Sequence, residues 1–508
     1  MNEKTLKTDS WVPRVRLLIG ILIPLVYFPL MVRLLGQEDY GLHSMADSVI
    51  ECLLLLTLCM GGAFSRLLEQ RRAESDPEGV RRIFGLYVKT FAVVALIILA
   101  AGLYISFHLG GFRRSLGEEE LEMLKKICLL MTVDAAVFLP LGAWRAVIDT
   151  HDGSGFLQLI DLGIAVLTPC AGLAVLLLGW ASIGLVSVSI GVHLIVFILY
   201  ILYVRKKAGV SPSLGRAGSG HLRQVIRSSV FPLLDLCAEV LFLPADRLIV
   251  GWMMGSHSAA LYSAGASVSV YLAGLCAMAG ARLTPLPDGW PERDQPEGSY
   301  DMLFIRYGRR QFILFFFIFS AFAVFGRHFL SLWAGSAYVR SYGVVLFTLA
   351  AMGIPLLQEA GTVLLHPFGR HRFHAVVFLC TAAVSVLLTL LLIKPWGVLG
   401  AAAATFVTYA AGGVVMNVFC YRSIGLDVNL FWKRIARMCP VMVPFGAVCW
   451  FAVNAIRATS WPLLIALAVV YTVLYFLLAR RFMMNARERD VTAAPFRKAW
   501  NRIAWRAG

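Results

Sequence analysis

The amino-acid sequence predicts an all-α, polytopic membrane protein with about 14 transmembrane helices. Of its 508 residues 59% are hydrophobic and only 15% are charged, and the mean hydropathy is +0.75. A soluble domain carries about 25% charged residues, so this chain lacks the polar surface that a soluble protein of its length needs. Helices that face lipid need no such surface, because their outward sides can remain apolar.

Hydrophobic runs of 19 to 26 residues follow one another along the chain. At about 1.5 Å per residue each run is long enough to cross roughly 30 Å of hydrocarbon. Backbone groups inside lipid must be hydrogen-bonded within their own segment, so we expect helices, and the alternating pattern of a membrane barrel is missing from the sequence. The runs occupy residues 17–35, 43–65, 83–107, 123–147, 156–179, 182–204, 228–252, 258–281, 310–334, 343–366, 374–394, 397–420, 438–456 and 461–480.

The basic residues alternate between the connections of these spans. If the N-terminus is cytoplasmic, 35 of the 46 Lys and Arg residues lie in cytoplasmic segments, nine lie in outer connections and two lie within predicted helices. This bias is the one that orients membrane proteins with their basic loops inside. An even number of spans then places both termini in the cytoplasm.

Net charge and cysteine content exclude two further classes of function. The net charge of +16 comes from bases spread over many helix ends rather than gathered in one patch, so we expect contact with membrane lipids and no nucleic acid. The ten cysteines are scattered singly, and none forms a CxxC pair. Neither a metal site nor a disulfide framework is therefore expected.

The polar connection after the sixth span divides the chain. We expect an N-terminal six-helix lobe, a cytoplasmic linker, a C-terminal six-helix lobe, an extra helix pair and a basic cytoplasmic tail. These parts occupy residues 1–204, 205–227, 228–420, 421–480 and 481–508 respectively.

The two lobes are expected to be related repeats. Residues 34–49 align without gaps to residues 253–268, with five identities in 16 positions, among them Gly36 with Gly255 and Ser44 with Ser263. Both stretches join the first and second helices of their lobes. Two six-helix repeats in the same orientation are a common way to build a transporter around a site near the middle of the membrane.

Four short motifs lie in order along the chain, each close to the end of a predicted span. They are residues 33–42 (RLLGQEDYGL), residues 246–251 (DRLIVG) with the following residues 261–263 (LYS), residues 330–335 (LSLWAG) and residues 368–372 (FGRHR). They resemble, in this order, the first loop, the seventh-to-eighth helix segment, the end of the ninth helix and the exit of the tenth helix of bacterial polysaccharide flippases. That family belongs to the multidrug/oligosaccharidyl-lipid/polysaccharide exporter (MATE-like) superfamily, and the resemblance covers essentially the whole chain.

The resemblance implies two pseudo-symmetric lobes around a central cavity that opens alternately to the two sides of the bacterial cytoplasmic (inner) membrane. It implies a transporter without catalytic residues or a bound cofactor, coupled to a proton or sodium gradient. The implied cargo is an undecaprenyl-pyrophosphate-linked oligosaccharide for cell-surface polysaccharide assembly. The implied partners are this lipid-linked oligosaccharide, membrane lipids and proteins of polysaccharide assembly.

Carboxylates within the spans are the candidates for cation coupling. A charge at the bilayer centre costs roughly 2.5 to 3.5 kcal/mol, so such residues usually serve a function. Asp47 and Glu51 are four residues apart, as are Asp235 and Glu239, so each pair shares a helix face. Asp134 stands in another span. The alternative for each of them is a structural ion pair.

Bases and aromatic side chains near the spans are the candidates for cargo binding. A pyrophosphate prefers guanidinium and ammonium groups, and the candidates are Arg33, Lys89, Arg145 and Arg247. Aromatic rings can stack on sugars, although ordinary packing is the commoner role, and the candidates are Tyr27, Trp252 and Tyr262.

Two predicted spans that begin the two lobes each contain a pair of prolines, namely Pro24 and Pro29, and Pro232 and Pro244. Each proline removes a backbone hydrogen bond and bends its helix. Paired bending of the first and seventh spans is therefore a gating hypothesis, and static kinks are the alternative.

Two other functions remain open at this point. Acids outnumber bases within the spans, which favours a cation-coupled multidrug exporter of the same superfamily, although 14 spans and the four motifs favour the polysaccharide side. A polytopic glycan polymerase or glycosyltransferase is less well supported, because no long outer loop carries a partnered catalytic set and no phosphate-binding loop is present in the sequence.

Overall fold

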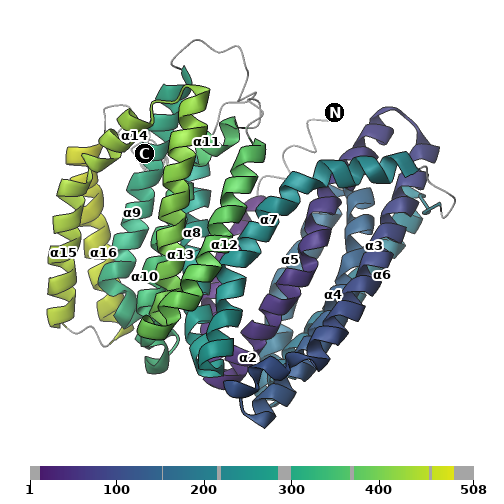
Figure 1. The fold of residues 1–508 in the computed structure, drawn as a ribbon, viewed down its shortest axis with the longest axis horizontal. Coiled ribbons are helices and arrows are strands. Elements are labelled where there is room, and N and C mark those ends of the chain that lie inside the picture. Colours follow the sequence, from purple (N-terminus) through teal and green to yellow (C-terminus); the bar gives the residue numbers. More distant parts are fainter. Residues whose placement is uncertain are drawn as a thin grey trace, which may run out of the picture. The chain divides into compact units, whose positions relative to one another are not determined.

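The computed structural model describes residues 12–151, 153–213, 219–283, 299–365, 371–456 and 460–484, and these residues form helices with no strand among them (Figure 1). The expected all-α fold is confirmed. The α-helices are α2 (Val12–Ala73), α3 (Pro77–Phe107), α4 (Glu118–Thr150), α5 (Ser154–Leu177), α6 (Ala181–Tyr203), α7 (Ser219–Met254), α8 (Ser256–Leu283), α9 (Ser299–Trp333), α10 (Tyr342–Leu357), α11 (Glu359–Leu364), α12 (His371–Trp396), α13 (Val398–Val415), α14 (Val428–Ala436), α15 (Cys439–Ile456) and α16 (Trp461–Leu478). The motif at residues 368–372 and the predicted tail at 481–508 lie largely outside the described residues.

Eleven helical segments of the described chain are long and apolar enough to cross a membrane. Each of them overlaps one of the predicted spans. The three other predicted spans lie in α2, which holds two of them, and in α7. The multi-pass architecture expected from hydropathy is therefore confirmed.

Helix α2 is interrupted at Gly36, where φ is +77° and ψ is 173°. Gly255, its counterpart in the aligned stretch, separates α7 from α8 with φ of +86°. Residues with a side chain rarely adopt this backbone conformation. The sharp turns between the first two helices of both lobes therefore depend on glycine at the same aligned position.

The chain divides into two compact units. Unit 1 comprises residues 1–263 and 378–401, and unit 2 comprises residues 264–377 and 402–508. Unit 1 thus includes α7, which the sequence places at the start of the second lobe, and most of α12.

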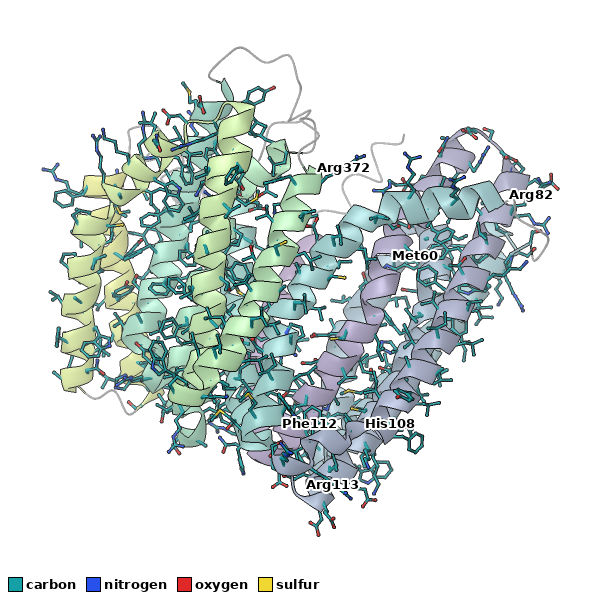
Figure 2. All side chains as sticks on the ribbon, viewed as in Figure 1. Met60, Arg82, His108, Phe112, Arg113 and Arg372 are labelled. Atoms are coloured by element: carbon teal, nitrogen blue, oxygen red, sulfur yellow. The ribbon has the colours of Figure 1, made fainter. Side chains whose placement is uncertain are left out.

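The core of unit 1 lies among α2, α3, α4 and α6. Phe64 stacks on Tyr87 with ring centroids 4.4 Å apart, and Phe84 meets Trp144 edge-on at 5.0 Å. Charged ends flank this apolar bundle: Figure 2 shows Arg82 and Arg113 at opposite ends of α3 and the short turn that follows it. This distribution is the one expected of a membrane-spanning bundle.

The core of unit 2 is built around α9, against which α10, α15 and α16 pack. Tyr475 of α16 donates a hydrogen bond of 2.8 Å to the carbonyl of Ile313, and Tyr471 lies 2.7 Å from the Ser320 hydroxyl. The final pair of predicted spans therefore belongs to the packed body of unit 2.

Candidate functional site

Unit 1 contains a cavity of about 420 Å³ between α2, α4, α5 and α6. Its wall is mostly apolar, with Met31, Leu54, Met131 and Phe138 among the lining side chains. Its polar lining consists of Tyr27, His43, Asp47, Thr168, Asp134, Ser189 and His193. A mostly apolar pocket with a few converging polar groups is the usual form of a ligand site.

Asp134 is the best-anchored polar group of this cavity. Its Oδ1 lies 2.7 Å from His193 Nδ1, and its Oδ2 accepts a 2.7 Å hydrogen bond from the Ser189 hydroxyl. A carboxylate beside Nδ1 orients the imidazole and assigns the proton to that nitrogen, which leaves Nε2 as the acceptor nitrogen of the neutral ring. The ring of Phe138 lies 5.0 Å from the His193 ring and restricts its movement.

Two further polar atoms of the cavity wall are buried and make no hydrogen bond with the described residues. They are His43 Nδ1 and Thr168 Oγ1. Buried polar atoms are nearly always hydrogen-bonded, so these two atoms are available to a ligand or a proton-carrying group that enters the cavity.

Arg247 of α7 faces two of the predicted cation-coupling residues. Its guanidinium lies 3.5 Å from Asp47 Oδ2 and 3.6 Å from Glu51 Oε2. Only 16% of the Arg247 side chain is exposed, yet Arg247 Nε and Glu51 Oε2 are buried without a hydrogen-bond partner in the described part of the chain. This cluster of Arg247, Asp47 and Glu51 is thus an ion-paired group with incompletely satisfied hydrogen bonding, and Asp47 connects it to the cavity.

The four candidate bases, Arg247 included, do not line the described cavity. Arg145 makes a two-pronged pair with Asp161 at 2.7 and 2.9 Å and also donates to Tyr200 at 3.3 Å. Arg33 is exposed near the end of the first part of α2, and Lys89 is half-buried in α3. The structure therefore brings Arg247, but not these three residues, together with Asp47 and Glu51.

The carboxylates of α7 have different surroundings. Asp235 is half-buried and Glu239 is exposed. Asp246 is fully buried and accepts hydrogen bonds of 2.7 Å from Tyr262 and 2.8 Å from Thr389. None of the three lines the described cavity.

The aromatic candidates are also separated. Tyr27 lines the cavity. Trp252 is 46% exposed and donates to the Gly111 carbonyl at 3.1 Å. Tyr262 has no exposed surface, so in this conformation its ring has no face open to a sugar.

The prolines lie within helices whose assignment runs through them. Pro24 and Pro29 are inside α2, and Pro232 and Pro244 fall within the bounds of α7. The break in α2 is at Gly36, seven residues beyond Pro29. Gating by paired bending at these prolines stays a prediction.

Residues 15–286 match the family described as "Polysaccharide biosynthesis protein". This chain belongs to that family. The membership agrees with the resemblance to polysaccharide flippases, and the match includes every residue of the cavity and of the cluster around Arg247.

Relatives of this family member share its length and fold. It is 19% identical to "Uncharacterized membrane protein EpsK" of Bacillus subtilis (strain 168), over 95% of this chain and 96% of the relative. A structure titled "Lipid II flippase MurJ, inward closed conformation" superposes with a TM-score of 0.66 at 9% identity, over 94% of this chain and 99% of that chain. An inward-facing multidrug resistance MATE family transporter of the MOP superfamily superposes with a TM-score of 0.63 at 14% identity, over 81% and 99%.

Sequence reasoning missed His43 and His193 of this family member. Both lie within predicted spans, but histidine is formally neutral at pH 7 and is therefore not among the intramembrane charges that predict a site. Histidine changes its charge near neutral pH. A search that included intramembrane histidines would have found both, since His43 lies one helical turn before Asp47.

Proposed function

We propose that this protein moves an undecaprenyl-pyrophosphate-linked oligosaccharide across the bacterial cytoplasmic membrane by alternating access, for cell-surface polysaccharide assembly. The proposal rests mainly on the match to the polysaccharide biosynthesis family, which covers all residues that line the cavity. The fold shared with a lipid II flippase over 94% of this chain supports it. Both termini are proposed to be cytoplasmic, and proteins of polysaccharide assembly are proposed as partners.

Arg247 is the proposed contact for the pyrophosphate. Its distances of 3.5 and 3.6 Å to the carboxylates of Asp47 and Glu51 exceed those of good charged hydrogen bonds. A pyrophosphate offers several oxygens that match the planar guanidinium fork. If a pyrophosphate took the place of the two carboxylates beside Arg247, the guanidinium would be more completely hydrogen-bonded. Asp47 and Glu51 would then be left to bind cations.

A proton is the proposed coupling ion, and Asp134 with His193 is the proposed site. Sodium requires several oxygen ligands, whereas both carboxylate oxygens of Asp134 already interact with His193 and Ser189. An imidazole whose Nδ1 is held by a carboxylate has Nε2 as the ring nitrogen that can accept a proton. Asp134 acts here as a positioning residue.

Export of cationic drugs is the second candidate. The cavity is lined by Asp47 and Asp134 and by no Lys or Arg among the described residues, which suits an organic cation, and the fold is shared with a MATE transporter. The lipid-linked saccharide is favoured because the family description concerns polysaccharides and because the flippase superposes on more of the chain.

A deletion strain tests the proposal. We expect the lipid-linked oligosaccharide to accumulate on the inner leaflet and the surface glycan to be lost, and we expect the wild-type gene to restore both. Resistance to cationic dyes is measured in the same strains. A normal surface glycan together with increased dye sensitivity would overturn the proposed flippase function and support drug export.

A further inference from the structure

Helix α14 (Val428–Ala436) is a short helix on the surface of unit 2, outside the 14 predicted spans. It follows a left-handed turn at Gly425, where φ is +83°, and a turn at residues 437–438 separates it from α15. Figure 1 shows it at one end of the helices of unit 2. It therefore connects two predicted spans at the end of the bundle where both of them are expected to reach the membrane surface.

One face of α14 is fixed to the body of unit 2. Phe431 is fully buried and stacks on Phe304 of α9 with ring centroids 4.4 Å apart. Gly308 makes this approach possible, because a Cβ at that position would lie 2.2 Å from the Phe431 ring. Val428 and Ile435 are buried on the same face.

The start of the helix is held by two carboxylates. Asp427 caps it by accepting a 2.9 Å hydrogen bond from the Leu430 amide. The Asp427 amide in turn donates to Asp301 Oδ1 at 2.7 Å. The negative charge of Asp427 thus lies at the helix N-terminus, where the backbone amides stabilise it. The two hydrogen bonds of Asp427 fix the orientation of α14.

The opposite face is cationic. Lys433, Arg434 and Arg437 are exposed, and no salt bridge joins any of them to another described residue. Trp432 is half-buried between the two faces and meets Phe431 edge-on at 5.3 Å. A basic face, a tryptophan at its border and an apolar face underneath are the features of a helix that lies in a membrane interface.

We propose that the outer face of α14 binds the phosphate groups of anionic phospholipids. The charge complementarity of Lys433, Arg434 and Arg437 selects an anionic headgroup, and the position of α14 between two predicted spans places it at headgroup depth. The site shares no residue with the cavity in unit 1 and lies outside the residues matched by the family. It adds a lipid-binding surface to the proposed transporter.

The test uses the full-length purified protein in a neutral detergent. Binding is measured by calorimetry with dioctanoyl phosphatidylglycerol, dioctanoyl phosphatidylcholine and inorganic phosphate. Each base near an anionic lipid surface contributes about fivefold to affinity, so the triple variant K433Q/R434Q/R437Q should bind phosphatidylglycerol up to roughly 100-fold more weakly. The three substitutions neutralise exposed side chains only. An unchanged elution volume and unfolding midpoint would show that the variant folds like the wild type.

The matched control is R205Q/K206Q/K207Q, which removes three exposed bases from another helix end, in unit 1. The proposal expects this variant to bind phosphatidylglycerol like the wild type. An equal loss in both triple variants would show a general effect of net charge and overturn the site. If inorganic phosphate binds as tightly as phosphatidylglycerol, the site binds a free anion rather than a lipid, and the proposal is overturned. Equal binding of phosphatidylcholine and phosphatidylglycerol would also overturn it.

Discussion

Ser263 donates a hydrogen bond of 2.9 Å to the hydroxyl of Ser44. The two serines occupy equivalent positions in the aligned stretches 34–49 and 253–268, and both are buried within unit 1. Contact between equivalent residues is what a two-fold relationship produces close to its axis. The aligned stretches therefore meet at the position where their sequences also agree.

Replacing either serine with alanine should reduce stability. Ser44 also donates to the Gly41 carbonyl at 2.9 Å, and Ser263→Ala removes the only donor to Ser44 Oγ among the described residues. We expect a loss of about 1 kcal/mol in the free energy of unfolding, measured by denaturant titration in detergent. Ser187→Ala is the control, because Ser187 is exposed and bonds only within its own helix. Equal effects in the control and in Ser263→Ala would contradict the role of the contact.

Alanine at Gly36 or Gly255 should be more destabilising than alanine at a glycine that has helical backbone angles and open space around it. Space is not the problem at Gly36, where an added Cβ would meet nothing within 4 Å, so the cost comes from its backbone angles. We expect a loss of about 1 to 3 kcal/mol for Gly36→Ala, seen as a lower unfolding midpoint. Gly62→Ala also has open space, but its φ is helical. That control should be neutral or slightly stabilising.

Changes at Arg247 should separate the need for charge from the need for a guanidinium. We expect R247K to bind the lipid pyrophosphate about tenfold more weakly and R247Q more weakly still, because lysine keeps the charge but loses the fork. Binding is measured with a soluble undecaprenyl-pyrophosphate analogue. The double variant D47N/E51Q should bind this anion more tightly than the wild type, since it removes the competing carboxylates. Unchanged binding in R247Q would remove Arg247 from the pyrophosphate site.

His193→Gln should remove the dependence of transport on an imposed pH gradient, because glutamine fills similar space but carries no exchangeable ring proton. Asp134→Asn should weaken the dependence less, since it disturbs the orientation of His193 but keeps the imidazole. The measurement is transport in vesicles with an imposed pH gradient. His108→Gln, at an exposed position outside the cavity, is the matched control. An H193Q protein that still follows the pH gradient would exclude His193 as the proton carrier.

The orientation in the membrane can be tested with two cysteine variants in a background without the native cysteines. Arg82 and Arg113 lie at opposite ends of the α3 region (Figure 2). A membrane-impermeant thiol reagent added outside whole cells should label R113C and spare R82C until the cells are opened. The reverse pattern would invert the proposed topology.

The helices were predictable because lipid imposes simple demands on length and polarity. Each of the 14 hydrophobic runs overlaps a helix of the structure. Helix α14 was not predictable in this way, because it has only nine residues. A hydropathy average over so short a helix mixes the values of its apolar and its basic face. The assignment of α7 and most of α12 to unit 1 depends on packing between distant segments, which no local pattern indicates.

The candidate site was only partly predictable. Spacing on one helix correctly put Asp47 and Glu51 on a shared face, and the structure adds Arg247 to them from α7. The partners of Asp134 come from α6, 55 and 59 residues away, and no local spacing indicates them. Tyr262 likewise has a partner, Asp246, on the preceding helix, and burial rather than residue type decides what its ring contacts.

The bond between Thr389 and Asp246 has a consequence for how the protein is made. Thr389 follows Asp246 by 143 residues, and a ribosome adds about 5 to 20 residues each second. For roughly 7 to 30 seconds, therefore, the nascent chain holds α7 with this carboxylate before α12 has been synthesised. Unit 1 cannot be completed until the insertion machinery has released a helix that is encoded behind a large part of unit 2, so premature termination anywhere before residue 389 would damage the half of the protein that was made first.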